Sequence, residues 1–109
     1  MNHVEAPCYA VIFTATLTED SDGYADMAKK LQGLVEDQPG YLGVRSVTEK
    51  NREITVSYWR TLEDIQAWKG LPNHAAAQAL GKSKWYSDYQ VEIARMERGY
   101  SFSESDTAS

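Results

Sequence analysis

The side chains best suited to chemistry gather in the second half of this chain. All three tryptophans and one of the two histidines lie between positions 59 and 85. Tryptophan and tyrosine rings can stack on a flat molecule, and an imidazole titrates near neutral pH. Large rings with polar edges suit a hydrophobic core equally well. The sequence therefore predicts either a core or the wall of a cavity in this stretch.

Two residues of the cluster each have a structural and a functional interpretation. Trp68 shares the apolar face of an expected helix, where it can fill the core, line a pocket or do both. His74 follows Pro72-Asn73 near the start of another helix, where Asn73 can act as a cap. His74 is therefore either a residue of the cap region or a proton acceptor at the mouth of a pocket.

Composition limits the classes of function. The chain has 109 residues, which suit one domain, and a net charge of −5 without a basic stripe that could follow a phosphate backbone. We expect no nucleic-acid partner. No membrane partner is expected either, because no stretch approaches the ~20 apolar residues of a membrane span. The single cysteine, Cys8, has no internal partner, which favours a cytoplasmic protein with Cys8 as a small buried hydrophobe.

Hydrophobic spacing predicts one domain at residues 8–102, between a loose N-terminal arm at 1–7, which holds His3, and a flexible C-terminal tail at 103–109. Strands are expected at 9–17, 41–48, 53–59 and 90–96, the last continuing toward 102. Helices are expected at 24–35, 61–69 and 74–80, and 81–88 is expected to be a connecting loop. Ser21 or Asp22 can cap the first helix, and Thr61-Leu62-Glu63-Asp64 resembles a capping box for the second.

This order of elements predicts an α+β, ferredoxin-like βαββαβ fold, a four-stranded antiparallel sheet with its helices on one face. The first and last strands carry apolar residues on both of their faces. An apolar sheet face left open to water is unusual in a soluble monomer. We therefore expect a homodimer in which two sheets pack face to face.

The pattern from residue 58 to the last strand resembles the antibiotic biosynthesis monooxygenase (ABM) domain family of the dimeric α/β-barrel superfamily. The resemblance covers roughly positions 8 to 102. It rests on Tyr58-Trp59-Arg60 leading into Thr61-Leu62-Glu63-Asp64-Ile65-Gln66-Ala67-Trp68, then on His74, Gln78, Trp85-Tyr86 and the strand end Ile93-Ala94-Arg95-Met96-Glu97-Arg98. It implies a dimeric α/β barrel with a pocket between the helices and the sheet of each protomer.

In this family such pockets oxygenate phenols or oxidise quinols without a metal or flavin. The resemblance thus implies a cofactor-independent monooxygenase or quinol oxidase acting on a small or polycyclic aromatic ligand. Trp68 and His74 are the expected catalytic residues, Trp68 stacking the ring and His74 managing the proton. The remaining expected pocket residues are Tyr58, Gln78, Trp85 and Tyr86.

One branch of the family degrades haem, and there the sequence departs from the pattern. That branch uses an asparagine on the first strand, a tryptophan on the second helix and a histidine ligand further along. Trp68 matches, but the residue ten positions later is Gln78, and the first strand holds no asparagine. A haem cofactor is therefore disfavoured, and none is expected. A third interpretation is a non-catalytic ligand-binding or stress-related dimer that uses the same cavity.

Overall fold

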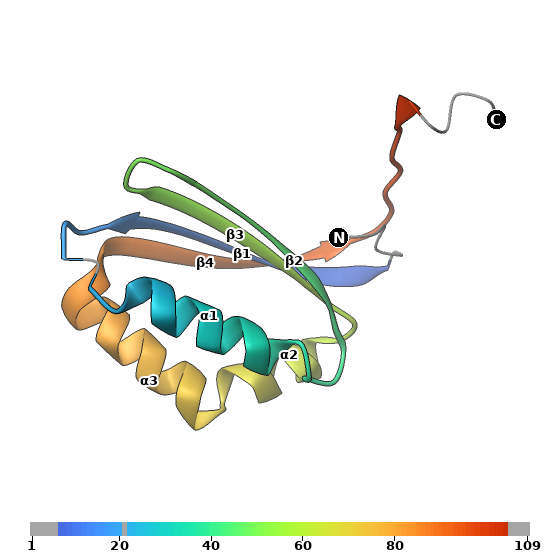
Figure 1. Ribbon diagram of the computed structural model, residues 1–109. Helices are drawn as coiled ribbons and strands as arrows, with labels where there is room; N and C mark the ends of the chain where they lie inside the picture. Colours follow the sequence, from blue (N-terminus) through green and yellow to red (C-terminus); the bar gives the residue numbers. More distant parts are fainter. Residues whose placement is uncertain (1–6, 21, 105–109) are drawn as a thin grey trace.

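The computed structural model describes residues 7–20 and 22–104. Its elements are β1 (Cys8–Leu17), α1 (Tyr24–Val35), β2 (Tyr41–Glu49), β3 (Arg52–Trp59), α2 (Leu62–Lys69), α3 (Pro72–Leu80), the π-helical turn η1 (Gly81–Trp85) and β4 (Tyr86–Met96). The strands form one antiparallel sheet in the order β2-β3-β1-β4, and the α-helices lie against one of its faces (Figure 1). The predicted α+β, ferredoxin-like βαββαβ fold is confirmed.

Several expectations fall on residues outside the described part of the chain. These are most of the N-terminal arm with His3, most of the C-terminal tail, and Ser21 as a helix cap. Within residues 7–20 and 22–104, no helix is long and apolar enough to cross a membrane.

Strand alternation decides which side chains meet the helices. Successive side chains of a strand point to opposite faces of the sheet. On β3 the odd-numbered residues turn toward the helices and end in Trp59, which is 1% exposed. Trp59 forms the core cluster with Val35 of α1 and Ile65 of α2, and Tyr9 and Val11 of β1 pack against it. This core joins the sheet to helices α1 and α2.

Helix α2 begins as the sequence predicts. The Thr61 hydroxyl accepts a hydrogen bond from the Asp64 backbone N–H at 3.1 Å and donates one to the Asp64 carboxylate at 2.8 Å. The side chain of Thr61 therefore satisfies one of the unpaired N–H groups of the first turn. Asn73 does not cap α3, because Leu71 holds the cap position and Pro72 occupies the first helical turn.

The last strand differs from its prediction at both ends. The segment 81–88, expected as a loop, forms the turn η1 and the start of β4. Strand β4 then ends at Met96 rather than continuing toward residue 102. The early start follows from pairing with β1, where Tyr86 aligns with Leu17 and Tyr89 with Ala15. Beyond β4 the chain runs away from the body of the domain (Figure 1), and Tyr100 is 98% exposed.

Gly40 holds the link between α1 and β2 close to the start of α2. Its φ is +78°, and a Cβ there would overlap the Asp64 carboxylate that takes part in the cap. Gly40→Ala is therefore expected to lower the free energy of unfolding by about 2 kcal/mol and the Tm by roughly 10 °C. Gly33→Ala is the matched control, because Gly33 is helical and a Cβ there meets nothing within 4 Å. That control should stabilise by about 0.5–1 kcal/mol, and equal shifts in thermal unfolding of the two variants would contradict this account.

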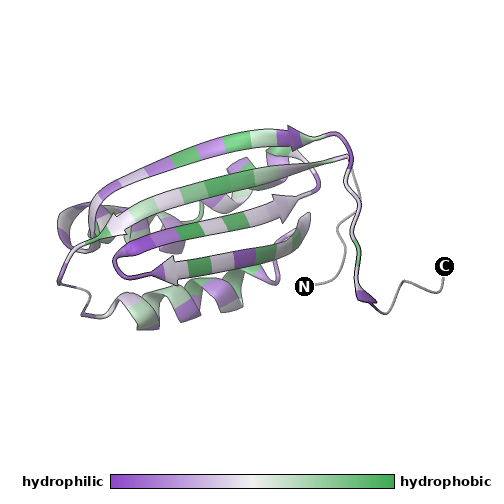
Figure 2. Cartoon of the chain, turned by 90° about the horizontal axis from the view of Figure 1, so that it is seen from above, coloured by the Kyte–Doolittle hydropathy of each residue, from purple (hydrophilic) through white to green (hydrophobic). Residues whose placement is uncertain are grey.

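Among the described residues, no helix covers the other face of the sheet (Figure 1). Val47 of β2 and Ile54 of β3 are cross-strand partners on this face and are 70% and 48% exposed. Figure 2 looks onto the sheet from above and shows apolar bands crossing neighbouring strands. Half-buried Ile12, Val56 and Tyr58 continue the same face. We call these five residues the open-face patch.

Candidate functional site

A cavity of about 410 Å³ lies between the sheet and the helices. This volume is within the ~300–1,000 Å³ typical of small-molecule sites. Every strand and every α-helix contributes to its wall, together with η1. The wall is rich in rings: Phe13, Tyr24, Tyr41, Trp59, Trp68, Trp85, Tyr86 and Tyr89. A wall of this kind suits a flat, largely apolar ligand.

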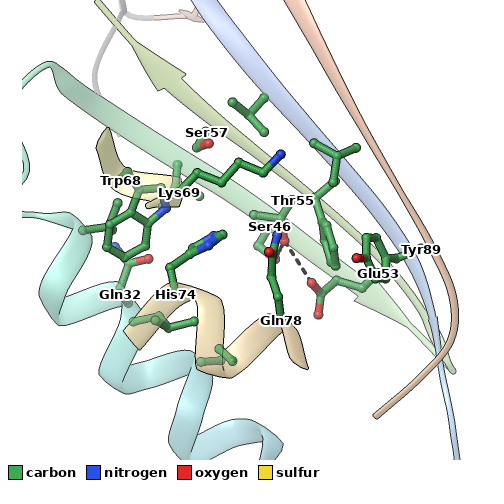
Figure 3. Close-up of a pocket in the computed structure, with 18 of the residues that line it drawn as sticks. Gln32, Ser46, Glu53, Thr55, Ser57, Trp68, Lys69, His74, Gln78 and Tyr89 are labelled. Carbon is green, nitrogen blue, oxygen red and sulfur yellow. Dashed lines mark hydrogen bonds between the residues drawn. The ribbon is translucent and has the colours of Figure 1, made fainter. Parts of the chain in front are cut away.

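One end of the cavity is built by Trp59, Trp68 and His74. The Trp59 and Trp68 rings are stacked with centroids 6.4 Å apart and 28° between their planes. The His74 and Trp68 rings pack in a T-shaped arrangement, with their centroids 5.0 Å apart and 66° between their planes. The indole N–H of Trp59 donates to the Ser57 hydroxyl at 2.9 Å. Trp68 and His74 thus form one wall of the cavity, and the hydrogen-bonded Trp59 ring packs behind Trp68. Figure 3 shows Trp68 and His74 side by side at this end.

His74 carries an unmet hydrogen-bonding atom at this end. Its Nδ1 is buried and has no hydrogen-bond partner among the described residues. Burial lowers the pKa of His74 below its ordinary value of 6.5, and the nearby positive charge of Lys69 lowers the pKa further. The ring is therefore neutral at pH 7, with one nitrogen free to accept a proton. An orphaned buried polar atom next to a cavity indicates a place for a ligand atom.

The other end of the cavity is polar and acidic. Tyr24 donates a hydrogen bond to Glu53 Oε1 at 2.5 Å, and Tyr86 donates to the Tyr24 hydroxyl at 3.1 Å. Thr55 donates to Glu53 Oε2 at 3.2 Å, and its oxygen lies 2.7 Å from the Ser46 hydroxyl. We call these five residues the Glu53 network. Burial, followed by the bond to Glu53, raises the pKa of Tyr24 far above its ordinary value of 10.0, so Tyr24 stays protonated.

The structure places five of the six predicted site residues on the cavity wall. Trp68, His74, Gln78, Trp85 and Tyr86 all line it. Trp85 also has a structural role, because its buried indole donates to the Asp22 backbone carbonyl at 3.0 Å.

Tyr58 is the exception and lies outside the cavity lining. It neighbours Trp59 on β3, so its side chain points to the opposite face of the sheet, where the Arg45 guanidinium lies 5.9 Å from its ring centre. Its expected place in the substrate pocket is therefore corrected. Tyr58 belongs to the open-face patch.

Sequence reasoning missed Glu53 and Tyr24. Glu53 follows the polar hairpin tip and resembles a solvated strand end, yet it is 9% exposed. The signal was its even spacing from Trp59, since residues 53, 55, 57 and 59 share one face of the strand. Tyr24 is the first residue of the helix expected at 24–35, and nothing in the sequence pattern indicates that its hydroxyl meets Glu53.

No metal centre is evident in the described ranges 7–20 and 22–104, where no three His, Cys, Asp or Glu side chains gather as potential ligands. The side chains of the site can stack on a ring, accept a proton at His74 and form hydrogen bonds through the Glu53 network.

A ferredoxin-like domain with an aromatic pocket between its sheet and helices defines the class of this protein. The profile of the antibiotic biosynthesis monooxygenase family matches residues 7–80, and the chain belongs to that family. A relative, the uncharacterized protein YqjZ of Bacillus subtilis (strain 168), is 43% identical over 102 residues, which are 93% of this chain and 90% of YqjZ.

Solved structures share the fold at low identity. A putative antibiotic biosynthesis monooxygenase from Nitrosomonas europaea has a TM-score of 0.74 and 13% identity, over 87% of this chain and 95% of that one. SnoaB, a cofactor-independent oxygenase from Streptomyces nogalater, has a TM-score of 0.68 and 11% identity, over 91% of this chain and 100% of SnoaB. At such identities the likeness establishes the fold alone.

Proposed function

We propose that this protein is a cofactor-independent monooxygenase or quinol oxidase that acts on a small or polycyclic aromatic phenol or quinol. The observation that carries the proposal is the buried, unpartnered Nδ1 of His74 beside Trp68 on the wall of a 410 Å³ cavity. Family membership and the oxygenase activity named for SnoaB support the same class of reaction. The single cysteine favours a cytoplasmic setting.

The chemistry begins with removal of a proton from the substrate. A phenol O–H bond breaks, a bond from that proton to a His74 ring nitrogen forms, and the resulting anion is a better electron donor to dioxygen. In quinol oxidation, the quinol and O₂ give quinone and H₂O₂. In monooxygenation, a phenol and O₂ give a quinone and water. Trp68 holds the ring by stacking, Gln78 orients an oxygen, and the apolar wall keeps water away from the anion.

The active form in this proposal is a homodimer that buries the open-face patch. Five apolar or aromatic residues share a face that the chain's own helices leave bare, and Ile54 and Val47 lie side by side in it. A second copy presents the same patch and satisfies it without a further partner. Each protomer holds a complete cavity wall, so the dimer supports the sheet beneath two separate sites.

Haem fits this cavity poorly. Haem carries two carboxylates, and the described cavity wall offers them Lys69 alone among lysines and arginines. Glu53 adds a buried carboxylate at the opposite end. We therefore propose no haem cofactor and derive no step through one.

A non-catalytic, ligand-binding dimer is the second candidate. It is favoured by the stacked Trp59 and Trp68 rings, which suit ligand binding whether or not turnover follows. Binding of a flat ligand without any oxygen uptake would support this candidate over the oxygenase.

His74→Phe is expected to lower oxygen uptake about 100-fold, because it keeps a ring against Trp68 and removes the base. The measurement is oxygen uptake with 1,4-naphthohydroquinone, corrected for its oxidation in buffer.

Because the pKa of His74 is lowered, kcat/KM of the native protein should stay constant below pH 6.5 and fall only when the imidazole is protonated.

Gln32→Leu is the matched control for that variant. Gln32 lines the same cavity from α1 and is half-buried, but it has no part in the proposed proton transfer. It should keep the rate within about threefold of the native value. The mechanism is wrong if no quinol is oxidised faster than in buffer, or if His74→Phe retains the native rate.

A further inference from the structure

Glu53 is a buried carboxylate without a cationic partner in the described structure. It is 9% exposed, and the ion pairs within residues 7–20 and 22–104 do not include it. A buried charge is costly unless hydrogen bonds or an opposite charge compensate it. The compensation comes from two neutral donors, the hydroxyls of Tyr24 and Thr55. The carboxylate faces the cavity, on the side away from Trp68 and His74 (Figure 3).

The direction of each hydrogen bond in the Glu53 network follows from the carboxylate, which can only accept when ionised. Tyr24 and Thr55 must both give their protons to Glu53. Tyr86 gives its proton to Tyr24, and Ser46 is left to donate to Thr55. Every hydroxyl proton of the network is thus already committed.

Acceptor capacity remains after this assignment. Each carboxylate oxygen can accept about two hydrogen bonds, and each oxygen of Glu53 accepts one from the network. A ligand atom that reaches this end therefore meets lone pairs and a negative charge, and no free hydroxyl proton of the network. The opposite end differs, because it offers His74 and the positive charge of Lys69.

We propose that the Glu53 end of the cavity is a subsite for a hydrogen-bond donor, which in the substrate class proposed above is an un-ionised ring hydroxyl. The chemical class of the ligand rests on the proposed function, whereas the preference for a donor rests on the Glu53 network alone. Glu53 accepts this hydrogen bond and repels an ionised oxygen. A substrate with two oxygens then binds in one orientation, with its neutral hydroxyl at Glu53 and its ionising oxygen near His74 and Lys69.

The first test compares two ligands on the native protein. 1-Naphthol has a donor hydroxyl, and 1-methoxynaphthalene replaces that proton with a methyl group. By isothermal titration calorimetry at pH 7, 1-naphthol is expected to bind at least about tenfold more tightly, since a hydrogen bond to a charged group contributes roughly that factor. A preference below about threefold, or binding of neither ligand at millimolar concentration, overturns the proposal without any variant.

The second test asks whether Glu53 causes the preference. Glu53→Gln should reduce it to about threefold or less, because the charge is lost and the amide brings donors of its own. Tyr24→Phe removes one donor to the carboxylate and leaves the charge, so the preference should be kept. If the network had only a structural role, the preference for 1-naphthol would change in the same way in both variants. Loss of the preference in Tyr24→Phe therefore overturns the proposal.

Glu92→Gln is the matched control. Glu92 is an exposed residue of β4, aligned with Ile12 on the opposite face of the sheet, and the same change of charge there should leave the preference unchanged. Binding and turnover are separate measurements. If naphthol is preferred and no oxygen is consumed, the donor subsite stands and the oxygenase proposal fails.

Discussion

Trp59→Ala is expected to lower the free energy of unfolding by about 3–5 kcal/mol, which is a large part of the stability of a small domain. Trp59 is 1% exposed and joins Val35 and Ile65 in the core cluster. Its ring contacts Tyr41 and Trp68 at centroid distances of 5.5 and 6.4 Å. Removing it both exposes the core to the cavity and takes away the support of Trp68. Urea denaturation of the native and variant proteins measures the difference.

Two milder substitutions separate the contributions of the Trp59 side chain. Trp59→Phe keeps part of the ring contacts and should lose about half as much stability. Ser57→Ala leaves the Trp59 indole N–H without its acceptor at 2.9 Å and should cost about 1–3 kcal/mol. A loss below about 1 kcal/mol for Trp59→Ala would contradict its place at the centre of the core.

Ile54→Lys is expected to convert the proposed dimer into monomers and to raise the dimer Kd at least 1,000-fold. The substitution places two like charges, one per protomer, among the apolar residues of a face that the dimer would bury. Ile54 is 48% exposed in the single chain, so the protomer itself should remain folded. Sedimentation equilibrium over a range of concentrations measures the mass of both proteins.

Leu80→Lys is the control for charge and lost apolar surface. Leu80 is 39% exposed at the end of α3, on the helical side of the molecule. It should leave the dimer intact. A native protein that sediments as a monomer at every concentration, or an Ile54→Lys protein that remains dimeric, contradicts the proposed interface.

Most of the fold could be predicted from local sequence patterns. The Thr61 cap and the alternation of β1 and β3 each act over a few residues, so their spacing could be interpreted directly. The ends of β4 could not, because its start depends on pairing with β1, distant in sequence. The turn η1 continues α3 past Gly81, a residue that in sequence suggests an end.

The candidate site divides in the same way. Trp68, His74 and Gln78 could be assigned to the pocket because they fall near the matching positions of a family pattern. Glu53 and Tyr24 could not, because their hydrogen bond joins residues 29 positions apart and neither residue has an unusual sequence context. Tyr58 was misplaced by one step of strand alternation, which moves a side chain from one face of the sheet to the other.

The three tryptophans make the intrinsic fluorescence of the protein sensitive to the contents of the cavity. Trp59 and Trp68 stand at the His74 end, whereas Trp85 packs against Tyr24 beside the Glu53 network, with ring centroids 5.3 Å apart. Each indole reports on the polarity of its surroundings, so an occupant changes the ultraviolet emission of the unmodified protein. Because the fluorophores sit at both ends, replacing Trp85 by Phe leaves emission from the His74 end alone. Comparing the tryptophan fluorescence of the native protein with that of the Trp85→Phe variant therefore distinguishes which end of the cavity is occupied.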